Sequence, residues 1–410
     1  METLTAGPQE EESKVALKDV LLSSIKKNGK QYTMFVALIA IWTIFSFLTE
    51  GIFFTPRNLS NLFVQAATTA ILGIGMVLII VAGHIDLSVG SVLGFCGAVC
   101  AMLMIRLEWG AMTAIGATLL VGLAIGTWHG FWVAYRGVPA FIVSLASMLA
   151  FRGLIIGITD GQTQGLEMAP PHVAEHFKLI GQGYFPTIFP ATENTIHDTS
   201  LYLSLLFIAV YVVSSLRKRA SRIKYGFQVP PMGREIARLV LVSAIIGAFS
   251  MIMVIYLGIP WCIILVLVLA VLFNFLASNT TLGRHLYAIG GNKDAALLSG
   301  INIRWKTMLL FMIMGVMTAV AGIVYTARLN AATTSAGQNA ELDAIAAAVI
   351  GGTSLMGGEG TIFGAVIGAL VMTSLDNGMS LMNLDITWQY VIKGLILLLA
   401  VWVDMAQRKK

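Results

Sequence analysis

The chain has 410 residues, of which 57% are hydrophobic and only 11% are charged. Soluble domains carry roughly 25% charged residues, so this composition excludes a soluble globular protein and predicts a chain that crosses a membrane several times. The net charge of +5 does not indicate nucleic-acid binding. The basic residues lie between apolar stretches, where they would contact anionic lipid head groups or the cytoplasm.

A helix needs about 20 apolar residues to cross the hydrocarbon of a bilayer. In chain order, the candidate spans are 33–50, 62–82, 88–105, 112–135, 139–158, 200–216, 237–256, 260–277, 307–327, 361–379 and 387–404. The stretch 342–351 is apolar but short, which predicts part of a strained crossing or a re-entrant half-helix. The sequence therefore predicts an all-α polytopic membrane protein with about 10–12 transmembrane helices and glycine-rich broken or re-entrant segments.

The distribution of Lys and Arg predicts the orientation of the spans. The segment 217–238 holds seven basic residues and one acid, whereas 159–199 holds one Lys and five acids. Because basic residues concentrate in cytoplasmic loops, we expect 159–199 to be an external loop and both termini to be cytoplasmic. The predicted organisation is one membrane domain, 33–404, with an N-terminal tail, 1–32, and a C-terminal tail, 405–410. Two cytoplasmic loops are predicted within the domain, a basic loop at 217–236 and a coupling loop at 278–306.

Two stretches place an acid between apolar runs. Residues 82–91, "AGHIDLSVGS", contain Asp86, and residues 349–371, "VIGGTSLMGGEGTIFGAVIGALV", contain Glu359. Each has an apolar helix, a Gly/Ser-rich break and a Gly-rich helix. Paired breaks of this kind mark the pathway of many transporters, so a two-half internal repeat is predicted; two ordinary interhelical turns are the alternative. The residues expected along a polar pathway are His84, Asp86, Ser88, Ser91, Ser354, Asn377 and Gln389.

Asp86 is interpreted as a helix cap. Its carboxylate precedes "LSVGSVLG" and would accept from the first N–H groups of a helix that begins near Leu87, which stabilises a helix by about 0.5–2 kcal/mol. Ser88 and Ser91 would then lie on one face of that helix. Direct contact between Asp86 and substrate is the alternative, just as Asn377 could cap a helix instead of lining the pathway.

Other residues within the spans have simpler interpretations. Arg152 and Lys393 would snorkel, pair with a carboxylate or line a polar pathway. His129 is interpreted as an interfacial residue, and the three cysteines as small packing residues without metal or disulfide spacing. Glycines at a spacing of four predict a smooth helix face for close packing: Gly122, Gly126 and Gly130.

Several catalytic motifs are missing from the sequence. It contains no GxxxxGK[ST], HExxH, CxxC or GxSxG pattern. Because ATP phosphates are held by the first of these patterns, the chain is not expected to hydrolyse ATP itself. No metal, no cofactor and no enzymatic activity are predicted.

The segment 284–304, "RHLYAIGGNKDAALLSGINIR", contains "DAALLSG", which fits the EAAxxxG pattern of ABC importer permeases with Asp294 in place of Glu. Together with "AGHIDLSVGS", "RGVPAFIVSLASMLAFRGL", "ARLNAAT", "ELDAIAAAVIGGTSLMGG" and "LDNGMS…WQYVIKGLILLLAV", it resembles the monosaccharide ABC importer permeases over about 35–405. The extended middle, about 159–236, is similar to that of the xylose and multiple-sugar permeases.

This resemblance implies a function and a set of partners. The chain would form the translocation pathway of an importer for xylose or several pentoses and hexoses in a bacterial inner membrane. It would act as a homodimer with a cytoplasmic ATPase of two nucleotide-binding domains and an extracytoplasmic sugar-binding protein. A short coupling helix would contact the ATPase through Asn292, Lys293, Asp294, Ala295, Ala296 and Gly300. An ion-coupled secondary sugar transporter or channel is the alternative, with Asp86 and Asp376 as its candidate ion ligands.

Overall fold

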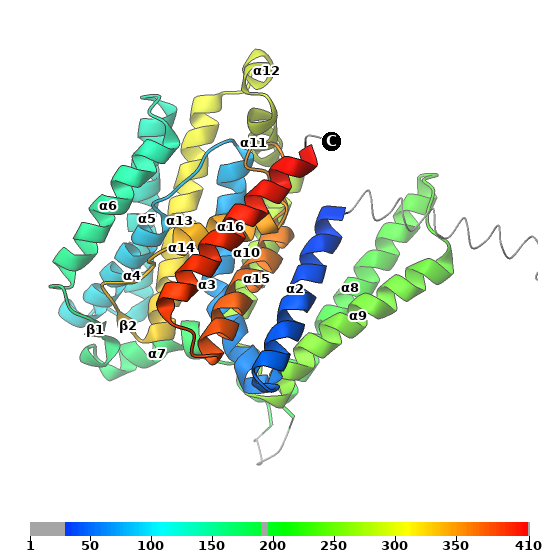
Figure 1. Ribbon diagram of the computed structural model, residues 1–410, viewed down its shortest axis with the longest axis horizontal. Coiled ribbons are helices and arrows are strands. Elements are labelled where there is room, and N and C mark those ends of the chain that lie inside the picture. The colour runs from blue at the N-terminus through cyan, green and yellow to red at the C-terminus, as the bar shows by residue number, and fades with distance from the viewer. Residues whose placement is uncertain (1–28, 190–195, 409–410) are drawn as a thin grey trace, which may run out of the picture.

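The computed structural model describes residues 29–189 and 196–408 (Figure 1). The predicted tail 1–32 lies outside these residues except for its last four positions, as do the final two residues of the chain. The long helices are α2 (Gly29–Leu48), α3 (Pro56–Val81), α4 (Val89–Arg106), α5 (Ala111–Ala134), α6 (Ala140–Ile158), α8 (Asp198–Lys224), α9 (Met232–Ile255), α10 (Trp261–Asn279), α13 (Ile303–Leu329), α15 (Ile362–Leu381) and α16 (Ile386–Arg408). The shorter elements are η1 (Ile52–Phe54), β1 (Gln164–Gly165), η2 (Leu166–Met168), α7 (Pro171–Gln182), α11 (Thr281–Gly291), α12 (Lys293–Leu298), β2 (Ala331–Ala332) and α14 (Ala340–Ile350).

The helices confirm the predicted fold class. Ten helices in the described part of the chain are long and apolar enough to cross a membrane, and Met34–Leu48 in α2 forms a shorter apolar helix. Each predicted span corresponds to one long helix, and the short stretch 342–351 is the eleven-residue helix α14. The protein is an all-α polytopic membrane protein whose described strands are one two-residue antiparallel pair, β1 with β2.

Helix α3 forms the centre of the molecule. Its most apolar stretch is 89% buried, which explains why it carries apolar residues on every side instead of on one stripe. Helices α13, α14, α15 and α10 pack around it. Because all four helices pack against α3, this helix fixes the relative positions of segments that are far apart in the sequence.

Helices α5 and α13 have the most extensive contact of the helix pairs in the described residues. The glycines predicted to give α5 a smooth face lie at this contact. A Cβ on Gly122 would lie 2.5 Å from the carbonyl oxygen of Gly315, and one on Gly126 would overlap the carbonyl oxygen of Phe311. Small residues therefore let the two backbones touch, which is how membrane helices gain packing energy without a hydrophobic driving force.

The contact predicts different effects for two glycines on the same helix. Gly126→Val should abolish folded protein, because the new side chain must displace the backbone of α13 and overpacking of this kind costs about 1–3 kcal/mol or more. Gly116→Val should be tolerated, because nothing lies within 4 Å of a Cβ at Gly116. The measurement is the monodisperse yield of each variant in detergent; equal yields would contradict the packing account.

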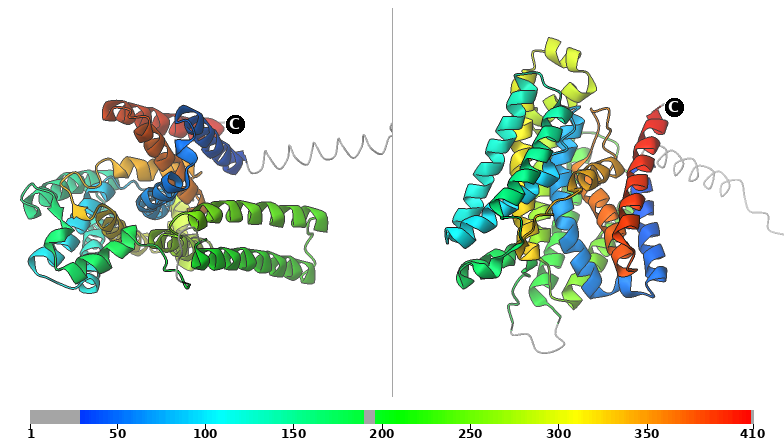
Figure 2. Two further views of the ribbon diagram at one scale, coloured as in Figure 1. Left: turned by 90° about the horizontal axis from the view of Figure 1, so that it is seen from below. Right: turned by 60° about the vertical axis from the view of Figure 1, so that its left-hand side comes forward.

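The two ends of the helix bundle carry different segments (Figures 1 and 2). The α11–α12 pair, the end of α16, the beginning of α2 and the turn between α8 and α9 lie toward one end, and α7 and the β1–β2 pair lie at the other. The side of the membrane on which these segments lie stays a prediction. The segments predicted as loops are mostly helical, because α8 continues to Lys224, α9 begins at Met232, and 278–306 contains α11 and α12.

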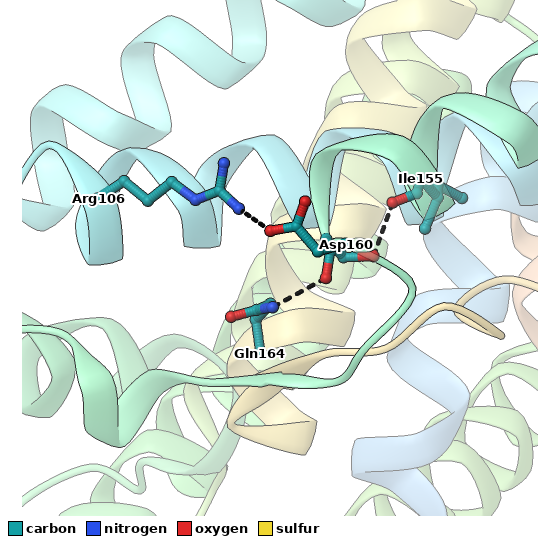
Figure 3. Close-up of polar contacts among 5 residues, drawn as sticks. Arg106, Ile155, Asp160 and Gln164 are labelled. Carbon is teal, nitrogen blue, oxygen red and sulfur yellow. Dashed lines mark hydrogen bonds and ion pairs between the residues drawn. The ribbon is translucent and has the colours of Figure 1, made fainter.

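The segment predicted as an external loop, 159–199, is folded against the bundle at several points. Figure 3 shows Arg106, at the end of α4, paired with Asp160 just after α6, with an N–O distance of 2.5 Å. Nearby, Gln164 Nε2 donates to the carbonyl oxygen of Thr159 at 2.8 Å. The Arg106–Asp160 pair is solvent-exposed, so it stabilises the fold by at most about 1 kcal/mol and mainly orients the chain as it enters β1.

Candidate functional site

The two breaks begin with the same helix ending. After α3, the N–H of His84 donates to the carbonyl oxygen of Ile79 at 3.0 Å, and Gly83 is left-handed with φ 81°. After α14, the N–H of Thr353 donates to Ala348 at 2.9 Å, and Gly352 is left-handed with φ 89°. This is the Schellman motif, in which glycine takes the left-handed position and the terminal carbonyls are satisfied within the chain.

The breaks meet each other and the end of α11. The carbonyl oxygen of Val81 accepts from the N–H of Gly358 at 2.8 Å, which joins the end of α3 to the α14–α15 loop. A Cβ on Gly290 would overlap that same carbonyl oxygen, so α11 approaches it backbone to backbone. Tyr287 on α11 also donates its hydroxyl to the carbonyl oxygen of Gly360 at 2.7 Å. Movement of α11 would therefore act on both breaks at once.

The structure corrects the expected role of Asp86. Helix α4 begins at Val89, and its N-cap residue is Ser88, whose side chain makes no capping bond. Asp86 instead accepts from Ser88 in two ways, from its N–H at 2.9 Å and from its hydroxyl at 2.6 Å. The carboxylate thus closes a turn before the helix, and the prediction of a helix starting near Leu87 with Asp86 as its cap is wrong by two residues.

The start of α4 is surrounded by buried polar groups. Three of their atoms have no hydrogen-bond partner within the described residues: Ser91 Oγ, His129 Nε2 and Glu341 Oε2. Glu341 lies against the backbone of Gly90, because a Cβ there would overlap its carboxylate, and His129 lies within electrostatic range of Asp86. Buried polar atoms without partners are rare and costly, so this cluster is suited to bind water or a polar substrate.

Two neighbouring groups extend this polar cluster. Arg152 on α6 donates to the carbonyl oxygen of Ala336 at 2.8 Å, in the segment that precedes α14. The ring of Phe311 lies 5.8 Å from that of His84 and 6.5 Å from that of His129, centroid to centroid. Two imidazole groups thus lie beside an aromatic ring, and an aromatic ring next to polar groups suits a polar ligand with apolar faces.

A cavity of about 820 Å³ lies between the first break and the α11–α12 pair. Its lining includes Gly83 and His84 from the first break, and Asn292 and Lys293 at the start of α12. His84 lies between the spanning helices α3 and α4, and burial, together with the charge of Lys293, lowers its pKa to about 4. His84 is therefore a neutral hydrogen-bonding group near pH 7, not a fixed charge.

The segment predicted to be a coupling helix forms the short helix α12, and its coupling role stays a prediction. Asn292 is its N-cap, accepting from the N–H of Ala295 at 2.9 Å; Asp294 lies in the first turn, and Gly300 ends the helix in a left-handed conformation with φ 80°. The orientation of the side chains differs from the expectation that Ala295 and Ala296 both contact the ATPase. Ala296 is only 4% exposed and faces inward, whereas Leu298 is 89% exposed.

The remaining expected pathway residues lie elsewhere or are engaged locally. The hydroxyl of Ser354 accepts from the N–H of Met356 at 3.1 Å, within its own loop. Asn377 exchanges two side-chain hydrogen bonds with Asn58, at 2.9 and 3.1 Å, and Gln389 donates to Leu384 at 2.9 Å. Of the expected pathway residues, those that lie together are the four from the first break and the start of α4: His84, Asp86, Ser88 and Ser91.

Lys393 pairs with two carboxylates. Its Nζ lies 2.8 Å from Asp376 and 3.1 Å from Asp343, which joins α16 to α15 and α14. Of the interpretations of Lys393 left open by the sequence, pairing is the one observed. Asp343 and Glu341 were not identified from the sequence, although two acids in the first turn of an apolar half-helix are a detectable signal.

Comparison with known proteins places the chain in a family. Residues 58–401 match the family model described as branched-chain amino acid transport system / permease component. The chain belongs to this permease family. It is 43% identical to the xylose transport system permease protein XylH of Haemophilus influenzae over 93% of this chain and 98% of that one. It is 33% identical to the ribose import permease protein RbsC of Escherichia coli K12, over 90% and 92%. No solved structure matches the chain.

The junction at Val81 predicts opposite outcomes for two adjacent glycines of the permease. Gly290→Ala should lower the unfolding temperature and the transport rate, because the methyl group would overlap a carbonyl oxygen that has no room to move. Gly291→Ala should behave as wild type, since nothing lies within 4 Å of its Cβ. Thermal unfolding and transport by both variants test this; a stable, active Gly290→Ala permease would refute the close contact.

The turn at Asp86 predicts a graded series. Asp86→Asn keeps an acceptor for Ser88 and should retain folded yield and most transport, whereas Asp86→Leu leaves a buried N–H and hydroxyl unpaired at a cost of about 1–3 kcal/mol each. Yield and transport of the two variants are compared. If Asp86→Asn folds fully and yet transports nothing, the carboxylate itself acts in the pathway.

Proposed function

We propose that this chain is the membrane subunit of an ATP-driven importer of monosaccharides, with xylose or related pentoses and hexoses as cargo. The observation that carries the proposal is the junction of Gly290, Val81 and Gly358, which links the α11–α12 segment to both breaks, the first of which leads into the polar cluster at the start of α4. A separate ATPase that moves α11–α12 would therefore act directly on the interior of the protein.

The proposed partners follow from this arrangement and from the likeness to XylH and RbsC. A separate ATPase docks at α12, a sugar-binding protein delivers cargo to the opposite end near α7, and two copies of this chain enclose the pathway. The end with α12 faces the cytoplasm of a bacterial cell, because the basic residues of 217–238 lie toward the same end. Both termini of the chain are then cytoplasmic.

An ion-coupled secondary transporter is the second candidate, and the position of Asp376 argues against it. A coupling ion would need Asp86 and Asp376 as free ligands. Asp376 is instead paired with Lys393 at 2.8 Å, and Asp86 holds Ser88. Oδ2 of Asp376 and Oδ1 of Asp86 are thus engaged within the protein, and the two residues lie on different elements.

The function is tested by reconstitution in proteoliposomes. The permease alone should hydrolyse no ATP, and with its ATPase and binding protein it should take up labelled xylose only when ATP is supplied. Collapsing proton and sodium gradients should leave uptake unchanged. Uptake by the permease alone, driven by an ion gradient, would overturn the proposal in favour of the secondary transporter.

The exposure of Leu298 predicts where the ATPase docks. Leu298→Asp should reduce ATP-dependent uptake by about tenfold or more, because a charge at the centre of an apolar contact is costly to desolvate. Phe227→Asp, at another exposed apolar position in the α8–α9 turn, serves as the control and should have little effect. Both variants should keep wild-type yield, and equal uptake by the two would place docking elsewhere.

A further inference from the structure

Helices α8 and α9 form a hairpin that extends away from the rest of the bundle (Figures 1 and 2). They pack mainly against each other. Only 11% and 17% of their apolar stretches are buried, compared with 89% for α3. Their outward faces carry exposed apolar side chains, among them Val210, Val213, Val240 and Leu241. In a membrane, these faces contact lipid.

A cavity of about 600 Å³ lies between the two helices near their turn. Four cations and four hydroxyl groups line it, together with one acid: Lys218, Arg219, Arg222, Arg238, Tyr211, Ser214, Ser215, Ser221 and Glu235. The lining therefore has a net charge of +3 and many donors. Tyr211, Ser215, Lys218 and Arg222 recur at intervals of three or four residues, so they share one face of α8.

The cavity lies at the depth of lipid head groups. Helix α8 has 27 residues and is therefore about 40 Å long, whereas the hydrocarbon of a bilayer is about 30 Å thick. The last apolar residue before the cations is Leu216, so the basic turns of α8 emerge where the hydrocarbon ends. The cavity thus has cations at head-group level and apolar helix faces directly below it.

We propose that this cavity binds the phosphate-bearing head group of an anionic glycerophospholipid, whose acyl chains lie along the exposed faces of α8 and α9. Arginine guanidinium groups bind phosphate oxygens well, and serine and tyrosine hydroxyls donate to the remaining oxygens. Basic pockets between membrane helices are suited to such lipids. The exposed apolar faces favour a lipid over a soluble phosphate, because only a lipid would also cover those faces.

Arg219 is kept in the experiment because it donates to the carbonyl oxygen of Pro230 at 2.7 Å and closes the turn. The site variant is Lys218→Gln/Arg222→Gln/Arg238→Gln. The control variant, Arg217→Gln/Lys224→Gln/Arg234→Gln, removes the same charge from the same hairpin but from residues outside the cavity lining. The experiment measures binding of fluorescent phosphatidylglycerol to the full-length purified permease in mixed micelles, with phosphatidylcholine of identical acyl chains as the reference lipid.

The wild type should prefer phosphatidylglycerol over phosphatidylcholine. The site variant should lose about tenfold or more in phosphatidylglycerol affinity, and the control variant should stay within about twofold. Equal losses in both variants would overturn the proposal, since binding would then reflect diffuse charge. Complete competition by glycerol phosphate at millimolar concentration would also overturn it, in favour of a soluble ligand.

Two further readouts keep the outcome unambiguous. Size-exclusion profiles and unfolding temperatures of both variants show whether the hairpin is folded, and the single variant Arg222→Gln is used if the triple variant aggregates. Binding of the partner ATPase should be the same for both triple variants. A selective loss of ATPase binding in the site variant, with lipid affinity unchanged, would assign the basic cavity to protein docking and overturn lipid binding.

Discussion

The structure depends on how two helices can end inside the protein. A helix end exposes carbonyl groups that water would normally satisfy, and each unsatisfied group in a low-dielectric interior is costly. In this protein, Gly83 and Gly352 solve the problem in the same way, by a left-handed turn that returns N–H groups to the last carbonyls. The carbonyl of Val81 is shared further, with Gly358 as donor. The breaks are stable because their backbone groups find partners in each other.

This solution explains why glycine is concentrated where helices or loops touch. Side chains at Gly290, Gly126 or Gly90 would occupy space that backbone or carboxylate atoms already fill. Contacts of this kind transmit motion efficiently, since backbone atoms in direct contact cannot yield as side chains do. The same rigidity suits the proposed coupling, in which binding of an ATPase at α12 would change the conformation of the polar cluster near α4.

The sequence predicts the spans well because crossing a bilayer imposes one strong requirement, a long apolar helix, that composition alone can meet. It also predicts a short apolar segment at 342–351 and two Gly-rich breaks, but not that Gly83 and Gly352 end the helices there. It does not predict which polar groups meet. The Asn58–Asn377 pair joins residues 319 positions apart, and Lys393 forms ion pairs with Asp343 and Asp376 on two other helices. Such partners are fixed by packing, not by local pattern. The sequence does not decide the role of Asp86, because an acid before a helix can either cap that helix or close the preceding turn.

The contrast between the polar cluster and the Lys393 site separates two uses of buried charge. The charge of Lys393 is balanced by Asp343 and Asp376, and these ion pairs hold α14 and α15 to the peripheral helix α16. The Lys393 site therefore pairs opposite charges across three helices, although Oδ1 of Asp376 there also has no hydrogen-bond partner among the described residues. At the start of α4, Ser91, His129 and Glu341 present atoms that the described residues leave unpartnered. Since the open groups lie next to the break that α11 contacts through Val81, the place suited to bind a polar cargo is also the place that a cytoplasmic motor would move.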